Sequence, residues 1–147
     1  MRIGAEPVPG GVRFRVWAPR RRSVEVVLED SRPLRLEAET NGYFSGVVES
    51  ARPGSLYRFR LYRGDRLFPD PASRFQPEGP HGPSQVMNAA SFAWSDHDWK
   101  GLGIEGQVLY EMHIGTFTPD GTWQAAEQVL PELEDVGITV LEIMPVA

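Results

Sequence analysis

Residues 108–114 read VLYEMHI and residues 138–146 read ITVLEIMPV, and these two apolar segments decide the fold of the region that contains them. Each has the composition of a strand that is covered on both faces of a parallel sheet. Between them an apolar side chain recurs every three or four residues, which predicts a crossover helix and therefore a right-handed βαβ unit. The apolar stripe of this helix consists of Ala126, Val129, Leu130, Leu133 and Val136.

Two residues set the expected limits of the helix, and a third lies within it. Thr122 can cap its first turn through the side-chain hydroxyl, and Gly137 can end it by taking the left-handed conformation. Pro131 lies between them. Because proline has no N–H to donate, we expect a kink at this position or two short helices end to end.

A single βαβ unit leaves two open strand edges and one uncovered face. Parallel strands occur almost only in sheets that carry helices on both sides. We therefore expect residues 107–147 to be the start of a (β/α)8 TIM barrel, a fold of roughly 250 residues, and the chain to be the front part of a longer protein. The remainder of the barrel, or another chain, would then have to cover residues 107–147.

The N-terminal half of the sequence has a different period. Apolar and polar residues alternate in residues 12–17, 24–29, 34–37 and 57–61, and a further strand is expected at 43–48. Short strands separated by turn-forming residues are typical of a small antiparallel β-sandwich, which we predict for residues 1–70. The inward-facing side chains are expected to include Phe14, Val26, Leu36 and Phe59.

Periodicity is absent from residues 71–106, which are rich in proline, glycine and serine. A loop of this length within a folded protein is usually functional or packed against another element. Its aromatic residues Phe75, Phe92, Trp94 and Trp99 argue against disorder. We interpret residues 71–106 as a connector that is docked across the boundary between the two domains.

Composition excludes several classes of protein. With 41% hydrophobic residues, 24% charged residues and a net charge of −5, the chain has no basic surface for nucleic acid. It has no cysteine, so disulfides and thiolate metal sites are ruled out. Neither the apolar run of a signal peptide nor eighteen consecutive apolar residues occur. We therefore expect a cytoplasmic protein that does not bind membranes.

Three motifs carry a family resemblance: VWAP at residues 16–19, YEMHIGTF at 110–117 and LEIMPV at 141–146. A sandwich with these motifs resembles the α-amylase family of glycoside hydrolases, glycoside hydrolase family 13. The members that begin with an immunoglobulin-like (E-set) domain include glycogen branching enzymes and maltooligosyltrehalose trehalohydrolases. Residues 69–84 and 115–122 are more similar to the trehalohydrolases. The resemblance covers essentially the whole chain.

This resemblance implies a retaining hydrolysis of the α-1,4 bond next to the trehalose end of maltooligosyl trehalose, with release of trehalose. Such a reaction needs a nucleophilic carboxylate and an acid/base carboxylate. The family takes these groups from the fourth, fifth and seventh barrel strands, which would follow Ala147. The chain alone is therefore expected to have no catalytic residue and no activity, and no cofactor or metal is implied. The alternatives are the N-terminal part of a branching enzyme and a non-catalytic carbohydrate-binding sandwich.

Within the chain, Glu111 and Glu142 are the carboxylates that invite a catalytic interpretation. Strand alternation places Leu109, Glu111 and His113 on one face, away from the helix. Both glutamates lie in mid-strand, whereas barrel active sites lie beyond the carboxyl ends of the strands, so we interpret them as barrel-interior residues. His113, Thr116 and Phe117 are nearer that end and are the candidates for lining the substrate site.

The remaining candidates are aromatic or basic. Exposed aromatic rings would make the sandwich a carbohydrate-binding module, whereas buried rings would form its core or brace the barrel. His81 and His97 have no second ligand at metal spacing, so no metal site is predicted. Residues 20–22, three arginines, are interpreted as a solvated loop, with a glycan or inter-domain contact as the alternative. The aromatic candidates for glycan stacking are Trp17, Tyr43, Phe44, Tyr62 and Phe68.

Overall fold

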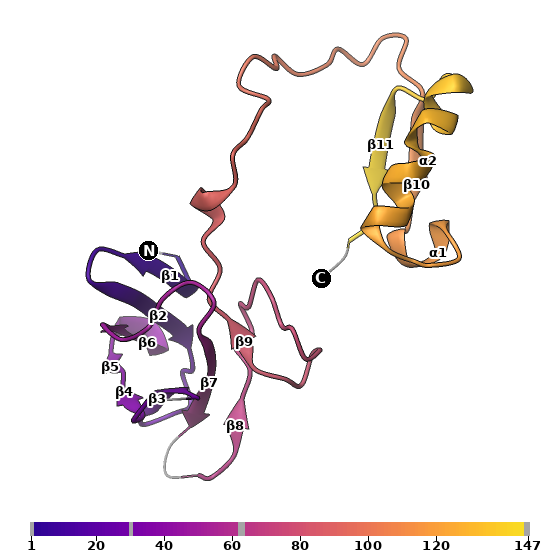
Figure 1. Ribbon diagram of the computed structural model, residues 1–147. Coiled ribbons are helices and arrows are strands. Elements are labelled where there is room, and N and C mark those ends of the chain that lie inside the picture. Colours follow the sequence, from indigo (N-terminus) through magenta and orange to yellow (C-terminus); the bar gives the residue numbers. More distant parts are fainter. Residues whose placement is uncertain (1, 30, 62–63, 146–147) are drawn as a thin grey trace. The chain divides into compact units, whose positions relative to one another are not determined.

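The computed structural model describes residues 2–29, 31–61 and 64–145. It divides the chain into two compact units, Met1–Ser95 and Asp96–Ala147, and each unit is described separately below (Figure 1). The first unit contains two antiparallel sheets, and the second contains one parallel pair of strands with helices.

The first sheet of the N-terminal unit has the order β1-β2-β6-β5, and every pairing in it is antiparallel. The strand β2 lies between β1 and β6, with Phe14 opposite Gly46 and Trp17 opposite Tyr43. A short 3-10 turn, η1, precedes β6. The bounds are β1 Gly4–Val8, β2 Gly11–Trp17, β5 Glu37–Ala38, η1 Thr40–Gly42 and β6 Tyr43–Val48.

The second sheet has the order β4-β3-β7-β8, and the short strand β9 also pairs with β7. All of these pairings are antiparallel. A second 3-10 turn, η2, follows β9. The bounds are β3 Val24–Leu28, β4 Leu34–Arg35, β7 Leu56–Leu61, β8 Leu67–Phe68, β9 Ser84–Gln85 and η2 Ala89–Ser91.

The inner faces of the two sheets form one apolar core. Phe14 of the first sheet meets Tyr57 of the second in an edge-to-face contact with ring centroids 4.8 Å apart. Phe14, Val26, Leu36 and Phe59 are all buried, which confirms the strand phase expected from the alternation. The predicted antiparallel sandwich is therefore confirmed. Its buried hydrophobic residues are Val12, Phe14, Val16, Val24, Val26, Leu28, Leu36, Phe44, Val48, Ala51, Tyr57, Phe59 and Val86.

The sandwich extends beyond residue 70, the limit expected from the sequence. Residues 84–85 form β9 on β7, and Val86 is part of the core. Asp70 is buried, accepts a 2.6 Å hydrogen bond from the Tyr57 hydroxyl and receives another from the backbone N–H of Ala72. The backbone N–H of Asp70 in turn donates to the Ser84 hydroxyl at 2.9 Å. This network attaches the first part of the expected connector to the sandwich.

The later part of the connector is exposed. Phe92, Trp94 and Trp99 each have well over half of their surface accessible, and Phe92 packs edge-to-face on Trp94. Phe75, in the earlier part, is also exposed. Docking of residues 71–106 across the domain boundary stays a prediction.

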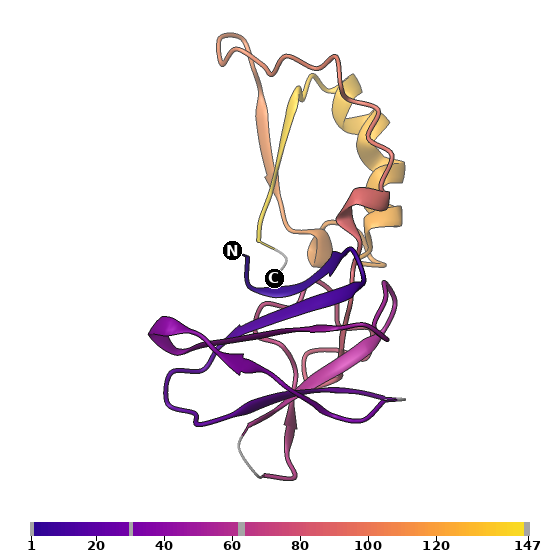
Figure 2. The same ribbon diagram turned by 90° about the vertical axis from the view of Figure 1, so that its left-hand side faces the viewer.

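In the C-terminal unit, β10 (Leu109–Met112) and β11 (Val140–Ile143) are parallel, with Glu111 opposite Glu142. The short helix α1 (Ile114–Phe117) begins where the first strand was expected to end. The expected second strand, 138–146, is limited to 140–143 among the described residues, and Val146 lies outside them. The helix α2 (Trp123–Asp135) lies along one face of the strand pair (Figures 1 and 2). The predicted βαβ unit is present, while a closed barrel remains an expectation.

The ends of α2 have the local geometry that the sequence predicts. Thr122 is the N-cap, and its hydroxyl accepts a hydrogen bond from the N–H of Ala125. At the other end, Gly137 has φ +91°. The N–H of Gly137 donates to the carbonyl of Glu134, and the N–H of Ile138 donates to the carbonyl of Leu133. These two bonds define a Schellman motif, which requires the left-handed conformation that glycine adopts without strain.

Two expectations for α2 differ from the structure. Pro131 lies inside one uninterrupted helix, so the two-helix alternative is wrong. Of the predicted apolar stripe, Ala126 is buried, Val129 and Leu133 are half-buried, and Leu130 and Val136 are exposed. Val136 is the C-cap residue, past the last helical turn, which explains its exposed fraction of 75%.

The face of β10 toward the helix is apolar, as expected. Met112 and Ile114 are buried with Ala126, and Phe117, Leu141 and Ile143 pack around them. Leu109, Glu111 and His113 are exposed. The second unit therefore has one covered face and one open face in the described part of the chain.

Candidate functional site

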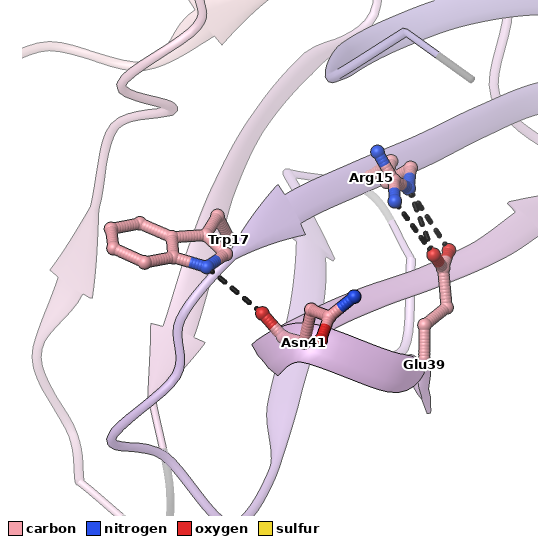
Figure 3. A network of polar contacts seen from close by, with 4 residues as sticks. All are labelled: Arg15, Trp17, Glu39 and Asn41. Atoms are coloured by element: carbon pink, nitrogen blue, oxygen red, sulfur yellow. Dashed lines mark hydrogen bonds and ion pairs between the residues drawn. The ribbon is translucent and has the colours of Figure 1, made fainter.

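The outward face of β2 and β6 carries a cluster of aromatic and charged side chains. Strand alternation buries Phe14, Val16 and Phe44 and directs Arg15 and Trp17 outward. Tyr43 lies directly across the strand pair from Trp17, so the two side chains project from the same face. Figure 3 shows Arg15 and Trp17 on this face together with Glu39 and Asn41 of the adjoining turn.

Trp17 is held in one orientation although 58% of its surface is exposed. Its indole Nε1–H donates a 3.0 Å hydrogen bond to the backbone carbonyl of Asn41. Asn41 has φ +61°, a conformation that asparagine tolerates better than most residues. The turn is therefore shaped to present this carbonyl to the indole.

The same turn is fixed by a close backbone approach. The N–H of Ala18 bonds to the carbonyl of Gly42 at 2.8 Å. Gly42 has φ +80°, and a Cβ atom at this position would lie 2.6 Å from Cα of Pro19. Only glycine fits here, so the turn that supports the indole has little freedom to move.

Arg15 and Glu39 form the charged part of the cluster. The Arg15 Nε lies 3.1 and 3.0 Å from the two carboxylate oxygens of Glu39, and one terminal guanidinium nitrogen lies 2.8 Å from Oε2. The guanidinium also lies over the ring of Tyr43, 3.8 Å from its centroid. Hydrogen bonds from Arg15 and Ser45 lower the pKa of Glu39 to about 2, so the carboxylate stays ionised at neutral pH. The outward face therefore carries one exposed ring, Trp17, and a charged pair whose guanidinium covers Tyr43.

The other predicted aromatic candidates do not join Trp17 in one platform. Phe44 is buried in the core, and Phe68 is half-buried with the Arg66 guanidinium 4.9 Å from its centroid. Tyr62 lies outside the described residues. The aromatic hypothesis therefore reduces to Trp17, with Tyr43 as its half-buried neighbour. Sequence reasoning missed Glu39 and Asn41, for which only the turn signal Asn41-Gly42 was available.

At the end of β10, His113, Thr116 and Phe117 lie within one short helical turn. His113 is the N-cap of α1, and its Nδ1 lies 3.4 Å from the Thr116 hydroxyl. Phe117 is half-buried and packs edge-to-face on Tyr110 with centroids 6.1 Å apart. His113, Thr116 and Phe117 lie close together because they belong to the same helical turn and its N-cap. A role for these three residues in lining a substrate site stays a prediction.

Glu111 and Glu142 are exposed and lie opposite one another in the parallel register. Like charges on directly opposed positions repel, so these side chains need a partner or solvent. In the described part of the chain no hydrogen bond or ion pair joins either side chain to another residue. Their assignment as residues of the barrel interior stays a prediction.

The remaining candidates add no further site. His97 lies 3.3 Å from the carboxylate of the adjacent Asp98, and Arg20, Arg21 and Arg22 are exposed, as a solvated loop would be. Within residues 2–29, 31–61 and 64–145, no three metal-binding side chains come together. No helix in these ranges has the length and hydropathy needed to cross a membrane.

Comparisons with known proteins agree with the sandwich and with the family resemblance. Residues 2–73 match the family model of carbohydrate-binding module 48, the isoamylase N-terminal domain. The chain is 40% identical to malto-oligosyltrehalose trehalohydrolase of Deinococcus radiodurans over 99% of its length, and 37% identical to that of Saccharolobus solfataricus over 100%. It spans 24% and 26% of those two relatives.

A solved structure supports the same assignment. The crystal structure of a putative α-amylase from Salmonella typhimurium is 43% identical to the chain, with a TM-score of 0.90. The match covers 99% of this chain and 25% of that one. The chain therefore corresponds to the N-terminal portion of the malto-oligosyltrehalose trehalohydrolase family of glycoside hydrolase family 13, and it carries the sequence of a carbohydrate-binding module 48 at residues 2–73.

Proposed function

We propose that the chain forms the N-terminal part of an enzyme that hydrolyses the α-1,4 bond next to the trehalose end of maltooligosyl trehalose. The observation that carries this proposal is the match to trehalohydrolases along 99% and 100% of the chain. The enzyme is proposed to act in the cytoplasm, with retention of configuration.

Within such an enzyme, the contribution of this chain is glucan binding and support of the barrel rather than catalysis. A carbohydrate-binding module occupies residues 2–73. The exposed Trp17, on the same strand face as Arg15, gives this sandwich an aromatic surface with the chemistry to contact a sugar. Glu111 and Glu142 lie within their strands, whereas barrel active sites lie beyond the carboxyl ends of the strands, so they receive no catalytic role in this proposal.

Binding and turnover by the 147-residue chain test this division of roles. Titration calorimetry should show weak binding of maltoheptaose and of maltooligosyl trehalose, and less binding of a cello-oligosaccharide of equal length. Trehalose release from maltooligosyl trehalose should stay at the level of a blank. Trehalose release that disappears in Glu111→Gln would contradict the non-catalytic assignment, and absence of binding to every α-glucan would contradict the glucan-binding role.

The reaction itself is tested in a longer enzyme that carries this chain at its N-terminus. Such an enzyme should release trehalose from maltooligosyl trehalose and should form no α-1,6 branches on amylose. Branch formation without trehalose release would assign the chain to a branching enzyme instead.

A further inference from the structure

We propose that the outward face of the second sheet binds a small phosphorylated sugar, in a cavity lined by three arginines. Arg22, Arg35 and Arg60 come from the loop before β3, from β4 and from β7. The site belongs to the other sheet from the one that carries Trp17, and it is independent of the proposed hydrolysis of an α-glucan. The other lining residues are Ser23, Glu25, Gly64 and Asp65.

The strand register brings two of these arginines together. The strand β3 buries every second residue, beginning with Val24, so Glu25 projects from the outward face. Glu25 lies opposite Arg35 of β4 on one side and opposite Arg60 of β7 on the other. Directly opposed residues project from the same face of a sheet, with Cβ atoms about 5 Å apart. Three charged side chains on neighbouring strands therefore line the cavity in one row.

The three arginines differ in their partners. The Nε–H of Arg60 donates a 2.7 Å hydrogen bond to Oε2 of Glu25. The guanidinium groups of Arg22 and Arg35 form no hydrogen bond or ion pair with any residue in the described part of the chain. Glu37 lines a neighbouring hollow with both arginines, yet it forms no ion pair with either. Because two cations in one cavity repel each other, an anionic group would be stabilised between them.

A phosphate group fits these two guanidinium groups in charge and in shape. A guanidinium is planar, and its N–H donors form a fork that can bind two oxygens of one phosphate. Arg22 and Arg35 are exposed and unpaired among the described residues, so no ion pair has to break before a phosphate binds. The whole chain has a net charge of −5. The attraction for an anion is therefore a local property of this cavity.

The remaining lining residues indicate what the phosphate is attached to. Glu25 and Asp65 carry carboxylates, which accept hydrogen bonds but repel a second anionic group. The hydroxyl of Ser23 can both donate and accept. The rest of the ligand is therefore neutral and rich in O–H donors, as a sugar is. No aromatic or aliphatic side chain lines the cavity among the described residues, so it offers no surface for a nucleotide base or an acyl chain.

The size of the cavity agrees with a monosaccharide. Its volume is about 410 Å³. Small-molecule sites span roughly 300 to 1,000 Å³, so the cavity lies near the lower end of that range. We assign the phosphate to Arg22 and Arg35, and the sugar hydroxyl groups to Ser23, Glu25 and Asp65.

Titration calorimetry of the 147-residue chain tests the class of ligand. Glucose 6-phosphate should bind at a single saturable site, and glucose should show no measurable binding. Inorganic phosphate and AMP should bind at least about fivefold more weakly than glucose 6-phosphate, because they lack hydrogen bonds that the sugar supplies. Equal binding of inorganic phosphate, or tighter binding of AMP, would overturn the assignment of a sugar. Absence of binding by glucose 6-phosphate would overturn the whole proposal.

Variants of the lining residues test the place of the site. Arg22→Ala and Arg35→Ala should each weaken the binding of glucose 6-phosphate at least about tenfold, because each removes charged donors from the phosphate. Arg21→Ala is the matched control, since Arg21 lies in the same loop as Arg22 and does not line the cavity. This variant should bind as the wild type does. Equal weakening in Arg21→Ala would indicate a non-specific attraction to the arginine run and would overturn the proposal.

Thermal unfolding provides a second readout and a check of folding. A ligand that binds only the folded state raises the melting temperature as its concentration increases. Glucose 6-phosphate should raise that of the wild type and of Arg21→Ala, but not that of Arg35→Ala. Arg35 is exposed on a two-residue edge strand, so Arg35→Ala without ligand should melt near the wild-type temperature. Arg35→Lys keeps the charge without the planar fork, so it should lose less affinity than Arg35→Ala.

The binding of maltoheptaose separates this inference from the proposed function. Arg35→Ala should leave it unchanged. Persistence of glucose 6-phosphate binding in Arg22→Ala and Arg35→Ala would therefore overturn the inference alone, and loss of α-glucan binding by the wild type would overturn the glucan-binding role alone.

Discussion

The sandwich and the βαβ unit contrast in how completely they bury their apolar side chains. Phe14, Tyr57 and Phe59 of the sandwich are almost fully inaccessible because one sheet covers the other. Among its described residues, the βαβ unit buries only Met112, Ile114 and Ala126. Yet α2 has a complete N-cap and a complete Schellman motif. Correct local signals define the elements of both units, but parallel strands are normally covered on both faces, and in the described residues α2 covers only one face of β10 and β11.

Hydrogen exchange should show the largest difference between the two units. In the monomeric chain, amides of β10 and β11 should exchange at least about a thousandfold faster than those of Phe14, Val26 and Phe59, because local opening of a half-covered unit costs little free energy. Mass spectrometry of peptides from 109–112, 140–143 and the sandwich strands measures this difference. Equal protection would mean that residues 107–147 form a self-sufficient domain.

Truncation of a core residue should affect the two units unequally. Phe59→Ala should lower the free energy of unfolding of the sandwich by about 3 to 5 kcal/mol, because its ring is buried on all sides. Met112→Ala, in the half-covered unit, should cost about 2 kcal/mol or less. Urea unfolding followed by circular dichroism measures both values. A near-wild-type midpoint for Phe59→Ala would show that the ring does not stabilise the core.

Removal of one buried hydroxyl should have a smaller effect. Tyr57→Phe leaves the buried carboxyl of Asp70 without its 2.6 Å donor, so the sandwich should lose about 1 to 3 kcal/mol. Tyr110→Phe, on a partly exposed ring in the βαβ unit, is the matched control and should be close to neutral. If both variants unfold alike, the Tyr57–Asp70 bond contributes nothing measurable.

The smallest effects should be two opposite responses of the sandwich to pH. Burial raises the pKa of Asp70 in the folded protein. The contribution of Asp70 to folding stability is therefore fully present at pH values below its unfolded pKa, near 3.9, and is lost as the pH rises through its folded pKa. Hydrogen bonds from Arg15 and Ser45 lower the pKa of Glu39 in the folded protein to about 2. The contribution of Glu39 to folding stability is therefore present at pH values above its unfolded pKa, roughly 4.3, and is lost as the pH falls toward 2.

Melting temperatures between pH 2 and 7 separate the two carboxylates. Asp70→Asn should remove part of the destabilisation that accompanies rising pH, and Glu39→Gln should remove part of the loss at acid pH. Identical pH profiles for both variants and the wild type would show that neither group is linked to folding.

The sequence was most informative where a strand has one buried face. Alternation identified Phe14, Val26, Leu36 and Phe59 as core residues, and the structure buries all four. It could not identify β9, because a two-residue strand has no period, and the contacts of Ser84 with Tyr57 and Asp70 join residues far apart in the sequence. The expected limit of the sandwich at residue 70 therefore fell inside the folded unit.

The candidate site was predictable only in part. Alternation placed Trp17 with Arg13 and Arg15 on the outward side of its strand, and the structure agrees. The contributions of Glu39 and of the Asn41 carbonyl depend on a turn that brings Glu39 to Arg15 and the Asn41 carbonyl to Trp17, each across 24 residues. Contacts between residues so far apart leave no periodic pattern in the sequence. A backbone carbonyl can accept a hydrogen bond whatever side chain its residue carries, so the residue type does not reveal it.

The bonds between Tyr57, Asp70 and Ser84 also decide where this protein can be divided. A cut after residue 70 would remove Ser84, which accepts from the Asp70 N–H, together with β9 and the core residue Val86. Proteases need an accessible, deformable segment, and residues 87–106 offer one with most side chains exposed. Limited proteolysis should therefore release a resistant N-terminal piece that ends after Val86, and this piece is the smallest part in which the sandwich keeps all of its strands.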